Sequence, residues 1–252
     1  QYYYLKKMII KKMNKYGLSI VFPIYNEESN TDKLTKEINY LIKQDLFDLE
    51  IIFVNDGSTD KTEKILINYL KSIKVKKKFI SYKKNKGKGF AIKSGVLRSS
   101  KEWVLTSDAD LSVSLKHVVN WFKKKEILTK NSAYYASRNH KYSKLKARLH
   151  RKVMGLFYQL LFKIVFMNSI SFIKDTQCGF KLYNKNYIKK IFSKITEYGF
   201  VHDIEIFILL YKKNINIKEM PVKWVFGKTS KVSLVKDSVI MFFKIFALKL
   251  KY

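Results

Sequence analysis

The sequence has little cysteine, proline or arginine, and it has no uncharged apolar run long enough to cross a bilayer. Its single cysteine, Cys178, excludes an intrachain disulfide and favours a reducing compartment. No run of about 18 uncharged apolar residues occurs, so no transmembrane helix is predicted. Internal repeats and low-complexity linkers are also absent. The first residue is Gln1 and not Met, and the interpretation leaves room for a membrane anchor ahead of it.

The charge of the chain is strongly one-sided. It has 51 basic and 20 acidic residues, which give a formal net charge of +31. All but four of the basic residues are lysines, and Ile, Asn, Tyr and Phe are abundant as well. An A+T-rich coding sequence is one explanation of this composition. The other is attraction to a polyanion, namely anionic lipid headgroups, nucleic acid or a phosphorylated substrate.

Apolar runs alternate with helical patterns, which is typical of βαβ units. The composition is 47% hydrophobic and 15% aromatic, as expected for a globular protein with a sizeable core. Strands are predicted within 17–28, 49–60, 78–89, 102–110, 133–140 and 215–226. Helices are predicted over 29–46, 61–73, 90–99, 149–173, 200–213 and 232–252. The predicted fold class is therefore α/β, with a mainly parallel sheet flanked by helices.

Two carboxylates follow the apolar strand that ends in VLTSDADLS. In extended backbone, Asp108 and Asp110 point to the same side, and they repel each other unless a cation lies between them. Mg²⁺ or Mn²⁺ suits such oxygen ligands and typically keeps a substrate phosphate in its shell. The alternative is a loop that caps a helix, because Asp and Ser favour caps.

Two further features suit a ligand that carries phosphate. The loop from Asn85 to Gly89 precedes a helix and could offer backbone N–H groups to a phosphate, although it matches neither the P-loop nor GxGxxG. Three of the four arginines lie between positions 138 and 151. The guanidinium of arginine offers paired N–H donors that match the oxygens of a phosphate. This cluster therefore indicates a phosphate-binding site, and the alternative is a chance grouping on the surface.

Taken together and in order, these segments resemble a known family. IVFPIYNEE, VNDGSTDKT, NKGKGFAIKSG and SDADLS resemble the nucleotide-binding half of inverting family 2 glycosyltransferases with a GT-A fold. SRNH, RLHRK, DTQCGFKLY and FVHDIEI resemble the dolichyl-phosphate glucosyltransferase branch. The resemblance implies a mixed, mainly parallel, Rossmann-like sheet. It also implies transfer of glucose from UDP-glucose to a dolichyl or other polyprenyl phosphate.

We predict that the chain has three parts. They are a basic arm (1–16), a GT-A domain (17–231) and an amphipathic C-terminal helix (232–252). Within the domain, residues 17–112 form the nucleotide-binding half and residues 113–231 the acceptor half.

On the donor side, Asp108 and Asp110 match the ligands of Mg²⁺ or Mn²⁺. Related mannosyltransferases often have Gln as a third ligand where this chain has Ser112. Asp56 is expected to read the edge of the base. The positions implied to line or close over the nucleotide sugar are Pro23, Tyr25, Glu27, Asp56, Gly87, Lys88, Gly89, Asp108 and Lys231.

The resemblance also implies which residues meet the acceptor and the transferred sugar. The catalytic residues implied are Asp110, Arg138, Arg151 and Asp203. The acceptor-side residues implied are Asp175, Gln177, Gly179 and Glu205. A phosphate acceptor is already largely anionic near neutral pH, so positioning and charge neutralisation are expected to drive the reaction. Asp203 is then expected to orient the sugar or the acceptor and not to abstract a proton.

A lipid acceptor gives the apolar segment 153–173 a second interpretation besides that of a core helix. It could lie in the membrane plane against headgroups, as could the C-terminal helix with Phe242, Phe243 and Phe246 among its lysines. We therefore expect a peripheral protein at the cytoplasmic face of a membrane, with an anionic lipid surface as a partner. The oligomeric state is not predicted.

Other functions stay open at this point. Within the family they are transfer of mannose from GDP-mannose to the same lipid, and extension of a surface polysaccharide. Outside it, the alternative is a basic nucleic-acid-binding module. The aromatic residues lie in apolar runs and not among exposed lysines, so no nucleic-acid partner is expected. A third class is a catalytically inactive membrane scaffold. The intact pair of Asp108 and Asp110 argues against it.

Overall fold

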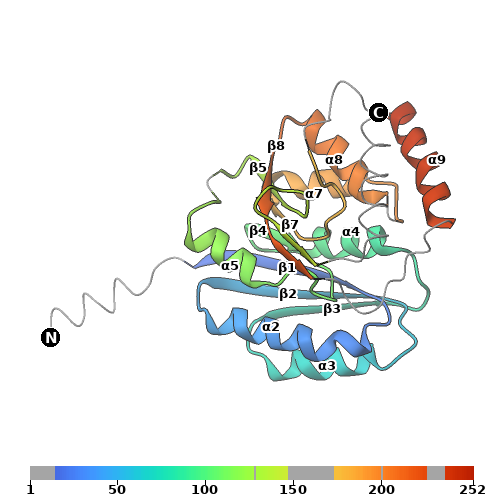
Figure 1. Cartoon of the computed structure of the whole chain (residues 1–252). Helices are drawn as coiled ribbons and strands as arrows, with labels where there is room; N and C mark the ends of the chain where they lie inside the picture. Colours follow the sequence, from blue (N-terminus) through green and yellow to red (C-terminus); the bar gives the residue numbers. More distant parts are fainter. Residues whose placement is uncertain (1–14, 128, 147–172, 200, 226–235) are drawn as a thin grey trace.

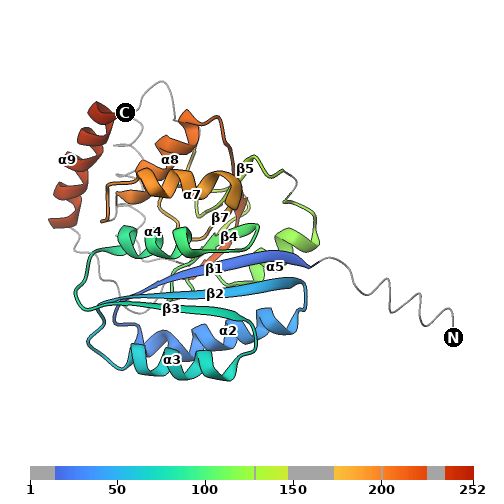
Figure 2. The same ribbon diagram turned by 180° about the vertical axis from the view of Figure 1, so that it is seen from behind.

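The computed structural model describes residues 15–127, 129–146, 173–199, 201–225 and 236–252. These residues form a seven-stranded sheet in the order β3-β2-β1-β4-β7-β5-β8, with helices on both faces (Figures 1 and 2). A separate two-stranded sheet pairs β6 (Lys144–Lys146) with β9 (Lys223–Val225). The predicted α/β class with a mixed, mainly parallel sheet is confirmed.

The first half of the chain builds the parallel part of the sheet. Its strands are β1 (Tyr16–Ile24), β2 (Phe47–Asp56), β3 (Lys76–Tyr82) and β4 (Trp103–Thr106). Its helical segments are the 3₁₀ turn η1 (Glu28–Asn30), α2 (Thr31–Lys43), α3 (Thr62–Ser72), α4 (Lys88–Arg98) and α5 (Lys116–Lys123). Helices α2 and α3 cover one face of the sheet, and α4 covers the other (Figures 1 and 2).

Strand β2 is buried on both faces, as a central parallel strand should be. Phe22 of β1 and Phe53 of β2 pack into the core under α2 and α3. Val21 and Val54 point the other way, toward α4. Gly95 lets α4 lie close to the sheet, because a Cβ at this position would come within 3.1 Å of Val54 Cγ2.

The second half of the chain adds an antiparallel strand. Strand β7 (Lys181–Asn184) runs antiparallel between β4 and β5 (Ser132–Ser137), and β8 (Asn216–Pro221) pairs parallel with β5. The remaining helices are α7 (Lys185–Lys194), α8 (His202–Lys212) and α9 (Lys236–Lys251). They pack on the same face as α4 and share its apolar core (Figure 1).

The predicted elements of the first half agree with the structure to within a few residues. The single strand predicted over 215–226 is wrong, because this segment forms β8 and β9 in two different sheets. Val222 lies between them, donates to Ser143 Oγ and accepts from the Lys144 N–H, which turns the chain from one sheet to the other. Helices α5 and α7 and strands β6 and β7 were not predicted.

Some expectations lie outside the described residues. They are the helix predicted over 149–173, most of the arm 1–16, and the site residues Arg151 and Lys231. None of the described helices combines the length and the hydropathy that crossing a bilayer requires.

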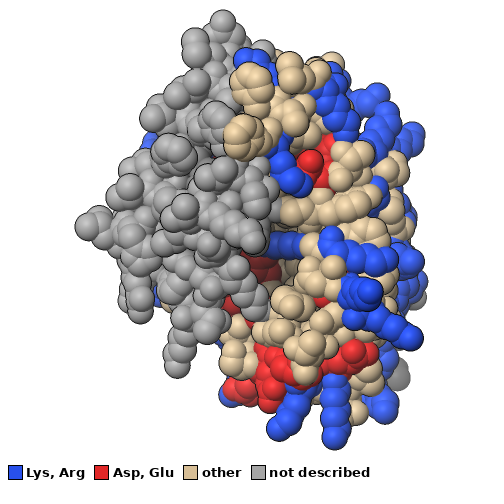
Figure 3. Space-filling view, turned by 90° about the vertical axis from the view of Figure 1, so that its right-hand side faces the viewer, with Lys and Arg blue, Asp and Glu red and all other residues tan. Residues whose placement is uncertain are grey.

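The carboxyl ends of the parallel strands β1 to β4 meet at one edge of the sheet, where α/β proteins bind ligands. Figure 3 shows the molecule from this side. Basic side chains gather over one part of this face, acidic side chains form an exposed group at its lower edge, and a few more acidic side chains lie recessed near its centre.

Candidate active site

Three carboxylates and one lysine converge at this edge of the sheet. Asp108 and Asp110 follow β4, and Asp203 lies in the first turn of α8. The Nζ of Lys88 lies 2.6 Å from Asp108 Oδ1. Burial lowers the pKa of Lys88, but the charges of the three carboxylates outweigh burial and raise it above its ordinary value. The fold therefore brings three predicted carboxylates, Asp108, Asp110 and Asp203, together around a fourth predicted residue, Lys88, which stays charged.

The turn that carries Asp110 is held from two sides. Ser112 donates its N–H to Asp110 Oδ1 at 2.8 Å and its hydroxyl to Oδ2 at 3.0 Å. Lys33 of α2 donates to the carbonyl oxygens of Asp110 and Leu111 at 2.8 and 2.9 Å. Leu111 has φ +49°, a left-handed conformation that leucine rarely takes. Ser112 and Lys33 thus fix the direction of the Asp110 carboxylate.

The Asp pair fits a hard divalent cation. The pKa of Asp110 is raised, first by burial and then by the charge of Asp108, and a bound cation would relieve this repulsion. Among the described residues, no group of three or more potential metal ligands occurs. A cation held by two carboxylates would take its other oxygens from phosphate and water, which Mg²⁺ commonly does in phosphate sites.

Gly179 lies against the Asp108 carboxylate. A Cβ at this position would come within 2.6 Å of Asp108 Cγ. Thr106 at the end of β4 donates its hydroxyl to the Gly179 carbonyl at 3.0 Å. The predicted acceptor loop therefore touches one of the two predicted metal ligands, and only glycine leaves Asp108 in its place.

The loop before α4 is bound to Asp56. Its two carboxylate oxygens accept the N–H groups of Lys86 and Gly87, each at 2.8 Å. The N–H of Gly89 donates to the Tyr198 carbonyl at 2.7 Å. These three N–H groups already bond to acceptors inside the protein, so they do not form a cradle for a phosphate. The group of this loop that can bind a phosphate is the side chain of Lys88. Each Asp56 oxygen keeps a second lone pair with which it can accept from a ligand.

The turns after β1 and β2 form one hydrogen-bonded unit. Asn26, at φ +50°, accepts the Thr59 N–H at 2.7 Å and donates its own N–H to Ser58 Oγ at 3.0 Å. Glu27 donates its N–H to Thr62 Oγ1 at 2.9 Å. Tyr25 stands at the rim of this unit and is 37% exposed. The predicted residues Pro23, Tyr25 and Glu27 thus lie at the end of β1 and in the turn that is bonded to the turn after β2.

Arg138 and Asp175 are paired with each other. The guanidinium donates from Nε to Asp175 Oδ2 at 2.7 Å and from Nη2 to Oδ1 at 2.8 Å, and its face lies 6.0 Å from the ring centre of Trp224. Burial raises the pKa of Asp175, but the charge and the hydrogen bonds of Arg138 outweigh burial and lower it. A guanidinium has five N–H donors. Asp175 takes two of them, so Arg138 keeps others for a ligand.

Gln177 follows in the same loop. Its N–H donates to Asp175 Oδ1 at 3.1 Å. Its side-chain Nε2 is buried and has no hydrogen-bond partner within the described part of the chain. A buried amide donor without a partner destabilises the folded protein. A ligand that accepts a hydrogen bond from this donor would remove that cost.

Asp203 is buried between two basic side chains. Lys181 of β7 donates to Asp203 Oδ1, and His202 Nε2 lies 3.4 Å from the same oxygen. Burial raises the pKa of Asp203, but His202, Lys181 and Lys88 together lower it, so Asp203 stays a carboxylate. Burial also lowers the pKa of His202. Lys181 was not predicted as a site residue, although a lysine flanked by Phe180 and Leu182 in a buried strand is a signal of a charged partner.

Glu205 does not join the other predicted site residues. Its carboxylate is fully buried on α8 and accepts the N–H groups of Thr196 and Glu197, both at 2.8 Å. It also accepts from Tyr252 Oη at 2.9 Å and from Lys251 Nζ at 3.1 Å. Glu205 therefore ties the turn before α8 to the end of α9.

Comparison with known sequences gives consistent matches. The model of glycosyl transferase family 2 matches residues 19–192. The dolichyl-phosphate beta-glucosyltransferase of Saccharomyces cerevisiae is 32% identical, over 89% of this chain and 71% of the yeast protein. Proteins of the same name from Dictyostelium discoideum and Homo sapiens are 31% and 30% identical. They are matched over 93% and 82% of this chain and over 74% and 67% of their own lengths.

Solved structures share the fold. Glucosyl-3-phosphoglycerate synthase of Mycobacterium tuberculosis was solved with Mn²⁺, UDP and glucosyl-3-phosphoglycerate. It superposes with a TM-score of 0.69 at 18% identity, over 96% of this chain and 81% of that chain. Mannosyl-3-phosphoglycerate synthase of Rubrobacter xylanophilus gives a TM-score of 0.65 at 15% identity, over 96% and 74% of the two chains.

Proposed function

The chain belongs to glycosyl transferase family 2 and is a glycosyltransferase, and we propose that it transfers glucose from UDP-glucose to dolichyl phosphate or a related polyprenyl phosphate. The observation that carries the proposal is the Asp108–Asp110 turn at the carboxyl edge of the sheet, with Lys88 beside it. The relatives from yeast, Dictyostelium and human, all named for this reaction, support the sugar and the acceptor. The mycobacterial neighbour, which was solved with Mn²⁺ and UDP, agrees with the choice of donor.

On the donor side, we assign Asp108 and Asp110 to a Mg²⁺ or Mn²⁺ ion and Lys88 to the diphosphate. A cation held there would neutralise the charge that develops on the leaving diphosphate. Lys88 is charged and points at the same place, so it adds a second positive group to the leaving side. Asp56 and Tyr25 lie where they could meet the base of the nucleotide.

On the acceptor side, we assign Arg138 and Gln177 to the lipid phosphate. Arg138 keeps N–H donors beyond those that Asp175 takes, and the Gln177 amide lacks a partner within the described chain. A phosphate oxygen attacks the anomeric carbon from the face opposite the diphosphate. The new C–O bond forms as the bond to UDP breaks, UDP leaves with the electron pair, and the configuration inverts.

No strong base is required for this step. A phosphate monoester has its second pKa at about 6, so the attacking oxygen is already anionic near neutral pH. Asp203 is held as a carboxylate by Lys181 and His202, which suits a hydrogen-bond acceptor for sugar hydroxyls. We therefore assign to Asp203 the orientation of the glucose and not the removal of a proton.

The substrates also bear on where the protein acts. A polyprenyl phosphate presents its headgroup at a membrane surface, while nucleotide sugars are water-soluble. We propose that the chain acts as a peripheral protein at the cytoplasmic face of a membrane, where both substrates are within reach.

A donor and acceptor screen tests this assignment. The full chain is incubated with Mn²⁺, a short polyprenyl phosphate and either radiolabelled UDP-glucose or GDP-mannose, and the lipid fraction is counted. Label from UDP-glucose in the lipid fraction is the expected result. Label from GDP-mannose alone would overturn the donor. Hydrolysis of UDP-glucose without a labelled lipid, or transfer only to a saccharide, would overturn the acceptor.

A further inference from the structure

Lys88 lies where the charges of the donor side meet. Its Nζ is 2.6 Å from Asp108 Oδ1, and its positive charge also interacts with Asp203 and Asp110. The side chains of Lys88 and Asp108 are 29% and 35% exposed, so water and ions reach this ion pair. A soluble cation can therefore take the place of the ammonium group at Asp108.

The backbone around Lys88 is held in place. Lys88 is the first residue of α4. Gly87 on one side donates its N–H to Asp56 Oδ2 at 2.8 Å, and Gly89 on the other donates to the Tyr198 carbonyl at 2.7 Å. The ammonium group stands at the end of a flexible four-carbon chain. Lys88 can therefore change its partner by rotating its own side chain, while the loop and the helix stay where they are.

A divalent cation at the Asp pair would need the carboxylate that Lys88 contacts. Both oxygens of Asp108 face Gly179, which closes one side of this carboxylate. Asp110 is held by the N–H and the hydroxyl of Ser112. Neither carboxylate has much freedom to keep two cations apart, and like charges that lie close together repel each other. Lys88 at Asp108 and a cation at the Asp pair therefore weaken each other's binding.

The charges of this cluster point to a third component. The cluster has three carboxylates and two lysines, namely Asp108, Asp110, Asp203, Lys88 and Lys181. A divalent cation alone would leave it with a net positive charge, which a partly buried site disfavours. A diphosphate brings several negative charges, and its oxygens bind both a metal ion and an ammonium group. It would therefore remove the conflict between Lys88 and the cation.

We propose that Lys88 and a divalent cation compete for Asp108, and that the diphosphate of the donor ends this competition by drawing Lys88 to its own oxygens. The proposal rests on the proposed function for the identity of the donor. Its consequence is coupled binding, in which the cation and the nucleoside diphosphate each bind more tightly when the other is present. Lys88 thereby makes tight binding of the cation depend on the donor.

The test measures Mn²⁺ binding by the full chain, with and without UDP, through the electron paramagnetic resonance signal of free Mn²⁺. Without UDP, the variant Lys88→Met should bind Mn²⁺ about tenfold more tightly than the wild type, because the competing charge is gone. With saturating UDP, the two proteins should agree within about twofold, because Lys88 of the wild type has then left Asp108. UDP should therefore tighten Mn²⁺ binding at least about fivefold more in the wild type than in the variant.

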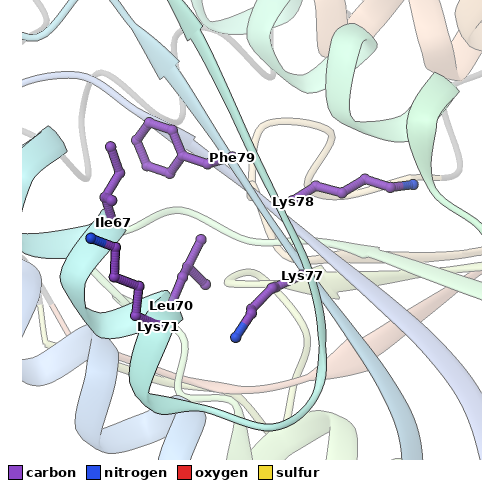
Figure 4. A pocket seen from close by; sticks show the side chains of 6 residues that line it. All are labelled: Ile67, Leu70, Lys71, Lys77, Lys78 and Phe79. Carbon is purple, nitrogen blue, oxygen red and sulfur yellow. The ribbon is translucent and has the colours of Figure 1, made fainter.

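Two further variants separate this effect from overall charge and from damage to the fold. Lys88→Arg keeps the positive charge, so its Mn²⁺ affinity without UDP should stay within about threefold of the wild type. Lys71 borders a groove of about 470 Å³ between α3 and the edge strand β3, together with Lys77 and Lys78 near the start of that strand (Figure 4). The Asp pair follows the end of β4, at the opposite edge of the sheet. Lys71→Met removes the same charge there and should change Mn²⁺ affinity by less than about twofold.

Several outcomes would overturn the proposal. They are unchanged or weaker Mn²⁺ binding by Lys88→Met without UDP, an equal gain in Lys71→Met, and an equal effect of UDP on the wild type and Lys88→Met. None of these measurements needs turnover or a lipid. A failed glucosyl transfer assay with tighter Mn²⁺ binding by Lys88→Met would overturn the proposed function and leave the competition at Asp108 standing. Glucosyl transfer by the wild type with unchanged Mn²⁺ binding in Lys88→Met would do the reverse.

Discussion

Asp108 shares its space with Gly179, which comes from a loop 71 positions later in the chain. The alanine variant Gly179→Ala would push the Asp108 carboxylate aside, because its Cβ would lie within 2.6 Å of Asp108 Cγ. The displaced group is the end of a side chain, so the fold should persist with a loss of about 1 kcal/mol. The Mn²⁺ concentration for half-maximal transfer should rise about 10- to 100-fold.

The matched control for this variant is Gly199→Ala. Among the described residues, and apart from its neighbours in the chain, no atom lies within 4 Å of a Cβ at that position, so stability and Mn²⁺ dependence should stay near wild type. An unchanged Mn²⁺ dependence in Gly179→Ala would show that Asp108 does not hold the cation.

The Arg138–Asp175 pair makes a prediction about pH. Asp175 has a lowered pKa when folded, so it stabilises the fold above its unfolded pKa of about 3.9, and this contribution is lost as the pH falls through the folded pKa. The variant Arg138→Met leaves Asp175 buried without its cation, and burial alone raises the pKa of Asp175.

The expected loss for Arg138→Met is therefore about 3–5 kcal/mol at pH 7 and smaller at pH 4.5, where the unpaired Asp175 is protonated in the folded state. Urea unfolding of both proteins at the two pH values measures the difference. An equal loss at both values would mean that the cost comes from lost packing and not from an unpaired charge.

At the scale of secondary-structure elements, Glu205 joins three segments: α8, the turn at residues 196–197 and the end of α9. The variant Glu205→Gln replaces an acceptor oxygen with an amide that cannot accept from all of these donors. We expect a loss of about 3 kcal/mol, which for a chain of this length lowers Tm by about 6–12 °C. Thermal unfolding followed by circular dichroism measures it.

The control for this prediction is Lys36→Met. Lys36 forms a salt bridge with Asp32 in which both side chains are largely exposed, and such pairs contribute only about 0–1 kcal/mol. If both variants lowered Tm by the same small amount, Glu205 would not be the anchor of α9.

The two halves of the chain differ in how much their sequence reveals at this scale. In the first half, the strands β1, β2 and β3 are each followed by polar turn residues and a helix, and there a local pattern was enough. The helix α5 after β4 was not predicted. Strand β7 pairs with β4 and β5 in the middle of the sheet, far from either in sequence, and no local pattern carries that pairing. The same holds for Lys181, whose partner Asp203 is known only once β7 and α8 are placed side by side.

For the molecule as a whole, the sequence motifs predicted the α/β class and the family, because several motifs of this family occur in one order. The motifs did not predict how the site residues engage one another. Arg138 is paired with Asp175, Asp56 holds the loop before α4, and Glu205 serves α9. Each of these contacts joins segments that are distant in sequence, so it follows from packing and not from a residue's own neighbours.

The central claim is that the Asp108–Asp110 turn supports metal-dependent transfer of glucose to a lipid phosphate. Its most direct test is the rate of glucosyl-lipid formation from UDP-glucose and a short polyprenyl phosphate, measured with Mn²⁺, with EDTA, and in Asp110→Asn with Mn²⁺. The exposed variant Asp32→Asn is the matched control. We predict that EDTA abolishes product and that Asp110→Asn lowers the rate at least about 100-fold, while Asp32→Asn stays at the wild-type rate. Wild-type rates in EDTA or in Asp110→Asn would contradict the account.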